Sequence, residues 1–361
     1  MASTTIPTHY PQLVDPTRTP LAFLNRAVPR LNRELKSEDL LLRQRAVRSL
    51  CDYLHDPEHI LPCLDEDIPA TLLALLKDND QFCRLKSAEC YYVIASHAIG
   101  RQAMLACNVI PRLAELFNDK EASVRRNAHK AVSMYSEAPP GAQNLIELRL
   151  VETLLKKLVS ELDEIKELIL NTIHFCLMVD VEQALAADAM STLTSLLGHP
   201  SDKIKTLVAL TIFHLSVSLK GKERAVEIGT VDRLVSLLDS DDKTLKSKTA
   251  LALSVICIIT PGKYCTIKAG AIPKLVALLN NESTELIVNA LKAITCIAEA
   301  PEGRKQLLES VDQIDQYVDH RLPNIAKHAQ IAAKIDQYVD HRLPNIAKHA
   351  QIAAKVIKWK P

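Results

Sequence analysis

The sequence predicts an all-α protein, specifically a right-handed α-solenoid of about seven to eight repeats with a 41-residue period. Three observations predict it. Glycine is scarce, at 8 of 361 residues where average usage would give about 25, and aromatic residues make up only 4%. Both figures disfavour glycine-framed phosphate loops and β-rich folds. Similar apolar segments recur along the chain at a nearly constant spacing, and within each unit the apolar residues follow one face of a helix.

Residues 1–20 are expected to form an extended, proline-rich arm. Prolines stand at positions 7, 11, 16 and 20, a spacing that disfavours helix. The segment has no apolar core, so it does not resemble a signal peptide. Two interpretations stay open, a disordered tail or an arm that orders along the solenoid or a neighbouring subunit.

Residues 21–313 are expected to form the repeat solenoid. The segment Gly270–Leu279, GAIPKLVALL, has relatives along the chain, and the last apolar residue of each relative serves as an anchor. Successive anchors are 41, 41, 41, 39, 41 and 41 positions apart, and they are Leu35, Leu76, Phe117, Leu158, Leu197, Leu238 and Leu279. Apolar residues also recur 7, 15 and 18 positions after each anchor, which is one face of a helix with 3.6 residues per turn.

Prolines and glycines divide each unit into helices. Proline stands six or seven positions before four of the anchors, where it suits the first turn of a helix. Seven of the eight glycines occupy two repeat positions, nine before or 24 after an anchor, and both positions predict turns between helices. Glu182 replaces the glycine in the unit with the 39-residue spacing, so we expect the superhelical twist to change there.

This pattern resembles armadillo repeats, which are three-helix units of about 42 residues with a Gly-Ala-Ile-Pro-x-Leu-Val-x-Leu-Leu signature. The resemblance covers residues 26–310. It implies that neighbouring units stack into one continuous core, because a single unit cannot bury its own apolar face.

Residues 314–361 are expected to form C-terminal helices and a capping turn in which Trp359 covers the last helix face. Residues 314–334 and 335–355 are identical, IDQYVDHRLPNIAKHAQIAAK twice. The other repeats agree only in apolar pattern, so this identity indicates either a recent duplication or an incorrect gene model. Each copy holds the end of one helix, a turn at proline and most of a second helix, and either copy could dock on the preceding repeat.

Particular residues narrow the family further. They are Asp15-Pro-Thr, the run from Leu31 to Glu58, the segment Ala298–Leu308 and the terminal segment Lys355–Pro361. Together they resemble the radial spoke head 14 family, whose known members lack the second copy of the duplicated segment. The resemblance implies a non-enzymatic structural component of the radial spoke in motile cilia and flagella, located in the cytoskeleton of the cytoplasm and in contact with other spoke proteins. It supplies no catalytic residues.

A basic column lies eight positions after successive anchors, at Arg43, Arg84, Arg125, Lys166, Lys205 and Lys246. Equivalent positions in a stacked solenoid form a line along one face, so the column could receive an acidic partner segment. Alternatively, the acids four positions before four of these residues pair with them locally near the helix start. Lys166 and Lys205 lack that acid and are the better candidates for partner contact.

The rival function is a soluble adaptor that binds extended peptides in transport or signalling. Armadillo proteins of that kind carry asparagine on the third helix of each repeat. At the nearest position, 17 after each anchor, this chain has Asp52, Val93, Met134, Phe175, His214, Val255 and Cys296. None is asparagine, which disfavours this function. The apolar members indicate core burial or packing against a protein surface.

The sequence contains no motif that indicates another class of function. The formal net charge of +1 gives no support for nucleic-acid or anionic-membrane binding. The nine cysteines form no C-x-x-C pair, and Cys51, Cys90, Cys176, Cys257 and Cys296 are expected to be buried in a reducing compartment. The pair His55 and His59 is expected to lie in a surface loop. We therefore expect no catalytic residues, metal, cofactor or small-molecule substrate.

Overall fold

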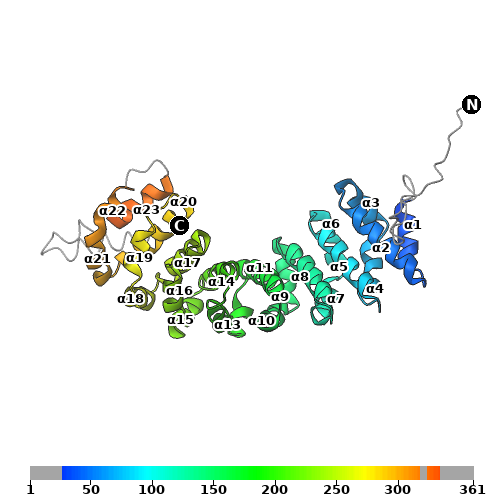
Figure 1. The fold of residues 1–361 in the computed structure, drawn as a ribbon, viewed down its shortest axis with the longest axis horizontal. Coiled ribbons are helices and arrows are strands. Elements are labelled where there is room, and N and C mark those ends of the chain that lie inside the picture. Colours follow the sequence, from blue (N-terminus) through cyan, green and yellow to red (C-terminus); the bar gives the residue numbers. More distant parts are fainter. Residues whose placement is uncertain (1–26, 318–322, 334–361) are drawn as a thin grey trace, which may run out of the picture. The chain divides into compact units, whose positions relative to one another are not determined.

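The computed structural model describes residues 27–317 and 323–333 (Figure 1). Every regular element in these ranges is helical, as the composition and periodicity predicted. The chain divides into two compact units, Met1–Leu196 and Leu197–Pro361. The predicted arm (1–20), the second copy of the duplicated segment (335–355) and Trp359 lie outside the described residues. The predicted division at residues 20 and 313 stays a prediction.

In the first unit, helices follow one another in sets of two short and one long. They are α1 (Ala27–Leu35), α2 (Leu40–Leu54), α3 (Ile60–Asp65), α4 (Ile68–Leu75), α5 (Gln81–Ala95), α6 (Ala98–Ala106), α7 (Ile110–Glu115), α8 (Ala122–Ser136), α9 (Pro139–Glu147), α10 (Leu150–Ser160), α11 (Asp163–Val179), α12 (Glu182–Ala186) and α13 (Ala189–Leu196), with the 3-10 turns η2 (Pro57–His59) and η3 (Leu116–Asn118). The long helices α2, α5, α8 and α11 pack side by side in chain order.

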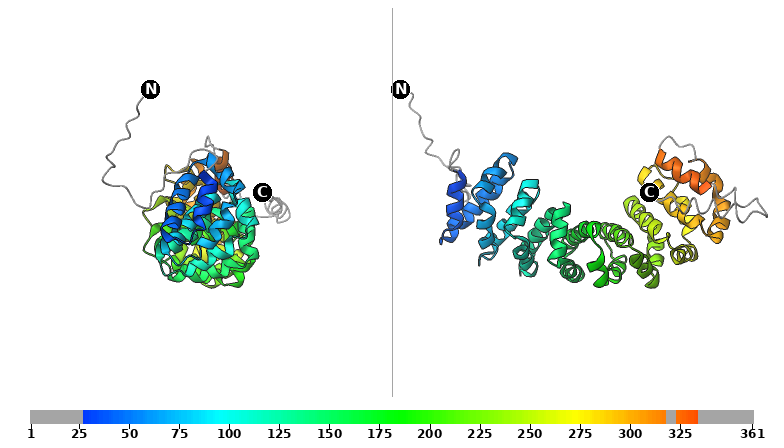
Figure 2. Two further views of the ribbon diagram at one scale, coloured as in Figure 1. Left: turned by 90° about the vertical axis from the view of Figure 1, so that its right-hand side faces the viewer. Right: turned by 180° about the vertical axis from the view of Figure 1, so that it is seen from behind.

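The second unit repeats the arrangement. Its helices are α14 (Asp202–Leu215), α15 (Leu219–Glu227), α16 (Thr230–Leu237), α17 (Lys243–Ile256), α18 (Thr260–Lys268), α19 (Ala271–Ala277), α20 (Thr284–Ala298), α21 (Pro301–Leu307), α22 (Val311–Asp315) and α23 (Pro323–Ala333), with the 3-10 turn η4 (Leu308–Ser310). Long helices α14, α17 and α20 pack in order, and α23 packs on α20. Figure 2 shows the stack in each unit from two further directions.

The anchors form the core of each repeat. All seven are buried, as are the residues 15 positions after them. The residues 7 and 18 positions after the anchors are buried too, except Leu42 and Tyr53 in the first repeat, which are partly exposed. Within each unit the long helices that carry these positions pack on one another, so burial depends on stacking and not on any single repeat.

The turn nine positions before the anchor is left-handed in every repeat for which the structure describes it. Gly229 and Gly270 have φ of 74° and 73°, and four residues with side chains share the conformation, namely Asp67, Asn108, Arg149 and Asp188. A left-handed residue with a side chain costs roughly 1–2 kcal/mol. The repeat geometry therefore imposes this turn, whether or not glycine occupies it.

At the glycines that follow the long helices, close packing leaves no room for a side chain. A Cβ atom on Gly100 would overlap the carbonyl oxygen of Ile94, at the end of the preceding long helix, and four other glycines are placed alike. Glu182 occupies this position in the fourth repeat. There the long helix α11 has 17 residues, and α12 has five where α6 has nine. The predicted change of superhelical twist stays a prediction.

The first copy of the duplicated segment supplies the end of α22 and α23. Helix α23 begins at Pro323, and Ile325, Ala329 and Ala332 are buried where α23 packs on α20. The phenol of Tyr317, the fourth residue of the copy, donates a hydrogen bond to the carbonyl oxygen of the anchor Leu279. The first copy therefore docks in the place of a third helix.

Candidate protein-interaction surfaces

The basic column begins with arginines that join neighbouring repeats. Arg84, on α5, donates from Nε to Oδ2 of Asp119 at 2.7 Å and from Nη2 to Oδ1 at 3.2 Å. Its Nη1 donates to the carbonyl oxygens of Asp78 and Asn79 at 2.8 and 3.0 Å. The side chains of Arg84 and Asp119 are only 11% and 7% exposed. One guanidinium thus fastens the end of its own repeat to the next.

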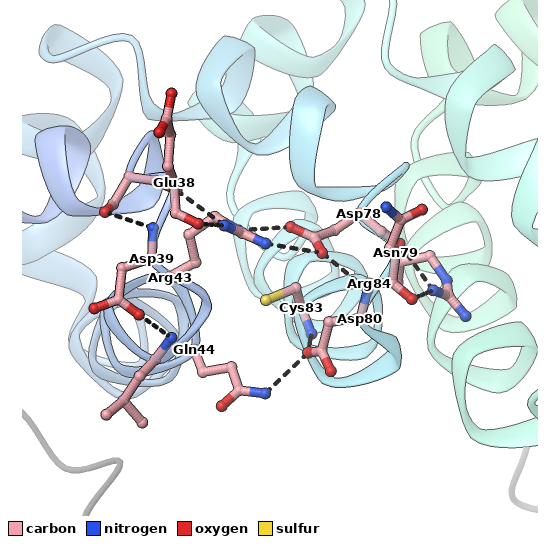
Figure 3. A network of polar contacts seen from close by, with 11 residues as sticks. Glu38, Asp39, Arg43, Gln44, Asp78, Asn79, Asp80, Cys83 and Arg84 are labelled. Carbon is pink, nitrogen blue, oxygen red and sulfur yellow. Dashed lines mark hydrogen bonds and ion pairs between the residues drawn. The ribbon is translucent and has the colours of Figure 1, made fainter.

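The same bridge occurs in the flanking repeats. Nε of Arg43 donates to Oδ2 of Asp78 at 2.8 Å, and Figure 3 shows the two side chains facing each other. Arg125 reaches Glu161 with Nε–Oε1 at 2.9 Å and Nη2–Oε2 at 3.2 Å. In both, Nη1 also bonds two carbonyl oxygens of the preceding loop. The three bridges form an inter-repeat clamp series in the first unit.

The bridge between Arg84 and Asp119 favours the charged form of both side chains. Burial by itself would raise the pKa of the Asp119 carboxyl, but hydrogen bonds from Arg84 and the backbone N–H of Glu121 hold it below its ordinary value. The hydrogen bond to Asp119 raises the pKa of Arg84 in turn. Charge-assisted, bidentate pairs of this kind are stronger than neutral hydrogen bonds.

The acids four positions before the column have a different role from the local pairing considered above. The carboxylates of Asp39, Asp80 and Asp242 accept hydrogen bonds from backbone N–H groups of Leu41, Cys83 and Leu245, so each caps a long helix. Local ion pairing was the wrong interpretation for Arg43, Arg84 and Arg125, because their ion pairs go to acids of the next repeat. The true partners stand two or three positions after the next anchor, and that recurring acid is the sequence signal we missed.

The lysines of the column are bonded differently. Nζ of Lys166 lies 3.2 Å from Asp163, and Nζ of Lys205 lies 2.6 Å from Asp202, so each has an acid three positions earlier. Lys246 is half-buried. The residues equivalent to Asp78 in the second unit, Ser240 and Asn281, are not acids. Partner binding by these six residues stays a prediction.

Comparison with known proteins agrees with this architecture. The family described as Armadillo/beta-catenin-like repeat matches residues 260–298. An engineered protein from a structural genomics consortium superposes with a TM-score of 0.81 at 21% identity, covering 93% of this chain and 89% of that one. The fold is an armadillo-repeat solenoid. A designed armadillo repeat protein, solved with the peptide (KR)4, superposes with a TM-score of 0.58 at 24% identity, covering 63% of this chain and 98% of its own.

The column of the armadillo repeats that includes Met134 and Phe175 is largely apolar and partly covered. Asp52 is exposed and Val93 is buried, while Met134, Phe175, His214, Val255 and Cys296 are half-buried. Asparagines do occur elsewhere on the long helices, at Asn127, Asn171 and Asn289, and two of them, Asn127 and Asn289, bond the preceding repeat. Each of the two donates to a backbone carbonyl of that repeat, Leu85 at 3.2 Å and Ser247 at 3.3 Å. These amides thus join repeats within a unit and do not form a ladder toward solvent.

Most cysteines of the described repeats are buried. Burial raises the pKa of Cys63, Cys83, Cys176 and Cys257 to about 12, so these thiols stay protonated at neutral pH. Cys296 was expected to be buried and is partly exposed, because it lies one position before the buried Ile297. In the described residues, no group of three or more metal-ligating side chains occurs.

The histidines of the loop after α2 are used within the loop. His59 stacks on Tyr53 with ring centroids 3.6 Å apart, and its Nδ1 lies 3.0 Å from the Tyr53 carbonyl oxygen. Nδ1 of His55 lies 2.7 Å from the Cys51 carbonyl oxygen. The expectation of a loop is thus confirmed. Among the helices that the structure describes, none has the length and apolar character that crossing a bilayer requires.

Sequence reasoning missed two columns at the turn after the long helix. Val217 and Ile258 occupy the same place in successive repeats, just after α14 and α17, and are 59% and 56% exposed. Five positions further on, Lys222, Lys263 and Arg304 donate to carbonyl oxygens at the end of the long helix. A comparison of equivalent repeat positions beyond the end of the long helix would have found both columns.

Proposed function

We propose that this chain is a non-enzymatic scaffold of the radial spoke in motile cilia or flagella, where it supports regulation of dynein-driven beating. The observation that carries the proposal is the series of arginine clamps at Arg43, Arg84 and Arg125, whose carboxylate partners are 9%, 7% and 5% exposed. Such clamps hold adjacent repeats at fixed spacing, which suits a load-bearing spacer better than a flexible peptide receptor. Burial raises the pKa of the Cys176 and Cys257 thiols to about 12, which disfavours a nucleophilic role for these two residues.

The assignment to the radial spoke rests on the sequence resemblance of residues 15–58, 298–308 and 355–361 to the radial spoke head 14 family. It places the chain in the cytoskeleton of the ciliary axoneme, bound to other spoke proteins. The alternative, a soluble adaptor for extended peptides, is disfavoured by the apolar, half-buried column that includes Met134 and Phe175. An extended peptide backbone needs hydrogen-bond donors and acceptors on the surface that binds it.

Extraction of demembranated axonemes tests the proposal. We expect the chain to stay with axonemes in mild salt, and to be missing from axonemes of mutants that lack radial spokes. Tubulin and a soluble cytosolic marker serve as controls for the bound and washed fractions. Release of the chain with the cytosolic marker, or its retention in spokeless axonemes, would refute the spoke assignment and favour the adaptor.

A further inference from the structure

The turns that end the long helices of the second unit carry a column of cations, of which Lys222 and Lys263 are buried. Nζ of Lys222 donates to the carbonyl oxygen of Val217 at 2.8 Å, and Nζ of Lys263 donates to that of Ile258 at 3.3 Å. Arg304 donates to the carbonyl oxygens of Ala298 and Glu299 at 3.2 and 3.0 Å. Each cation thus caps the carboxyl end of a helix, where the helix dipole favours positive charge.

One member of this column has a carboxylate partner from the next repeat. Nζ of Lys263 lies 2.7 Å from Oε2 of Glu299, which stands at the end of α20. Glu299 reaches the lysine from the solvent side, since its side chain is 50% exposed while that of Lys263 is 11% exposed. This pair shows how a carboxylate seats on a cation of this column.

Lys222 has the same place in its repeat without that carboxylate. The residue equivalent to Glu299 in the repeat after Lys222 is Ile258, at the turn that ends α17. Lys222 is only 8% exposed, and burial lowers the pKa of its ammonium group. Within the described residues this ammonium makes no ion pair, and it donates one hydrogen bond although it carries three protons. A buried cation of this kind gains most from an added carboxylate.

The surroundings of Lys222 are apolar and exposed. Val217 and Leu219, which flank it at the turn between α14 and α15, are each 59% exposed, and Ile258 is 56% exposed. Isolated exposed apolar residues are ordinary, but here two lie close to one buried cation along the chain and the third, Ile258, stands at the place equivalent to Glu299, which makes a chemically specific surface. We call Val217, Leu219, Lys222 and Ile258 the Lys222 notch.

We propose that the Lys222 notch binds a segment of a partner protein that carries a glutamate or aspartate flanked by apolar residues. The carboxylate takes the place on Lys222 that Glu299 takes on Lys263, and the flanking side chains cover Val217, Leu219 and Ile258. Charge complementarity selects an acidic segment over a basic one, and the apolar rim selects against a simple polyacidic tail. The notch lies within the second unit, and the proposal stands whether or not the chain is a spoke protein.

Peptide selection tests the proposal. Random dodecapeptides displayed on phage are selected for binding to the purified full-length chain, and those that also bind I258E are removed. The glutamate in I258E supplies the missing carboxylate from within, as Glu299 does for Lys263. We expect enriched peptides to hold an acidic residue between apolar ones. A synthetic copy should bind at least tenfold more weakly to I258E and to K222M. The variant V159E, which changes a similarly exposed valine of α10 in the first unit, should bind like the wild type.

Three outcomes would overturn the proposal. They are enriched peptides without an acidic residue, equal binding by wild type and K222M, and no peptide that distinguishes wild type from I258E. Light scattering measures whether the chain is a monomer or a dimer. A wild-type dimer that becomes monomeric in I258E would identify a second copy of the chain as the occupant and refute a separate partner. Far-UV circular dichroism of K222M and I258E checks that both variants fold, and the peptide with glutamine in place of its acid repeats the test on unaltered protein.

Discussion

Replacing Arg84 with methionine removes the central inter-repeat clamp and leaves the Asp119 carboxylate without its main partner. The pair is nearly buried, with side chains 11% and 7% exposed, and Arg84 makes four hydrogen bonds in all. Breaking a buried, hydrogen-bonded pair from one side costs about 3–5 kcal/mol, because the remaining charge stays in a poorly solvated site. We expect R84M to lower the free energy of unfolding of the first unit by about that amount.

Urea unfolding at pH 7, followed by far-UV circular dichroism, measures this loss, and amide hydrogen exchange in α5 and α8 localises it. The matched control is K156A, which breaks an ion pair to Glu152 whose side chains are 74% and 59% exposed. An exposed pair at this helical spacing contributes about 0.5 kcal/mol or less. The double variant R84M/D119N should recover part of the loss. It removes the stranded charge and keeps an acceptor for the Glu121 N–H, which bonds Oδ1 of Asp119 at 2.9 Å.

Equal losses in R84M and K156A would refute the reasoning, because they would show that the buried clamp contributes no more than a solvated pair. A further loss in R84M/D119N relative to R84M would contradict the claim that the stranded carboxylate causes the cost. Uniform exchange across the first unit in R84M would contradict the local assignment to the α5–α8 junction.

Three further predictions follow from buried or crowded positions. His129 is fully buried against Phe117 with neither ring nitrogen hydrogen-bonded, and burial lowers its pKa to about 3. Because its pKa in the unfolded chain is near 6.5, the contribution of neutral His129 to the free energy of unfolding is complete above pH 6.5 and decreases as the pH falls below it, by about 2 kcal/mol at pH 5. The urea midpoint of H129L should not show this part of the pH dependence. G100A should lower the free energy of unfolding by about 1–3 kcal/mol, measured by thermal melting, because its Cβ would overlap the Ile94 carbonyl oxygen; an unchanged melting temperature would contradict this. Mass-mapped iodoacetamide labelling should modify the partly exposed Cys265 well before the buried Cys257, whose pKa burial raises to about 12; simultaneous labelling in folded protein would be inconsistent with the packing.

The sequence by itself determined the repeat period, the helical class and the core positions. Anchors such as Phe117 and Leu158 are buried where the spacing placed them, because burial in a solenoid follows from a short pattern that each repeat carries. The turns at Gly229 and Gly270 could be read in the same way. The acid-before-base spacing at Asp80 and Arg84 was a real pattern too, although it indicated a helix cap and not a local ion pair.

Only the tertiary structure decided which side chains meet across repeats. Arg84 bonds an acid of the next repeat, Lys263 bonds a glutamate at the following turn, and Lys222 has an isoleucine at the place equivalent to that glutamate. The left-handed turn at Arg149 likewise carries no signal in its residue type. The physical reason is that these features depend on the register between stacked helices and on desolvation at their contacts. A local apolar pattern fixes which face of a helix is buried, but it does not specify which polar group of the next repeat lies opposite.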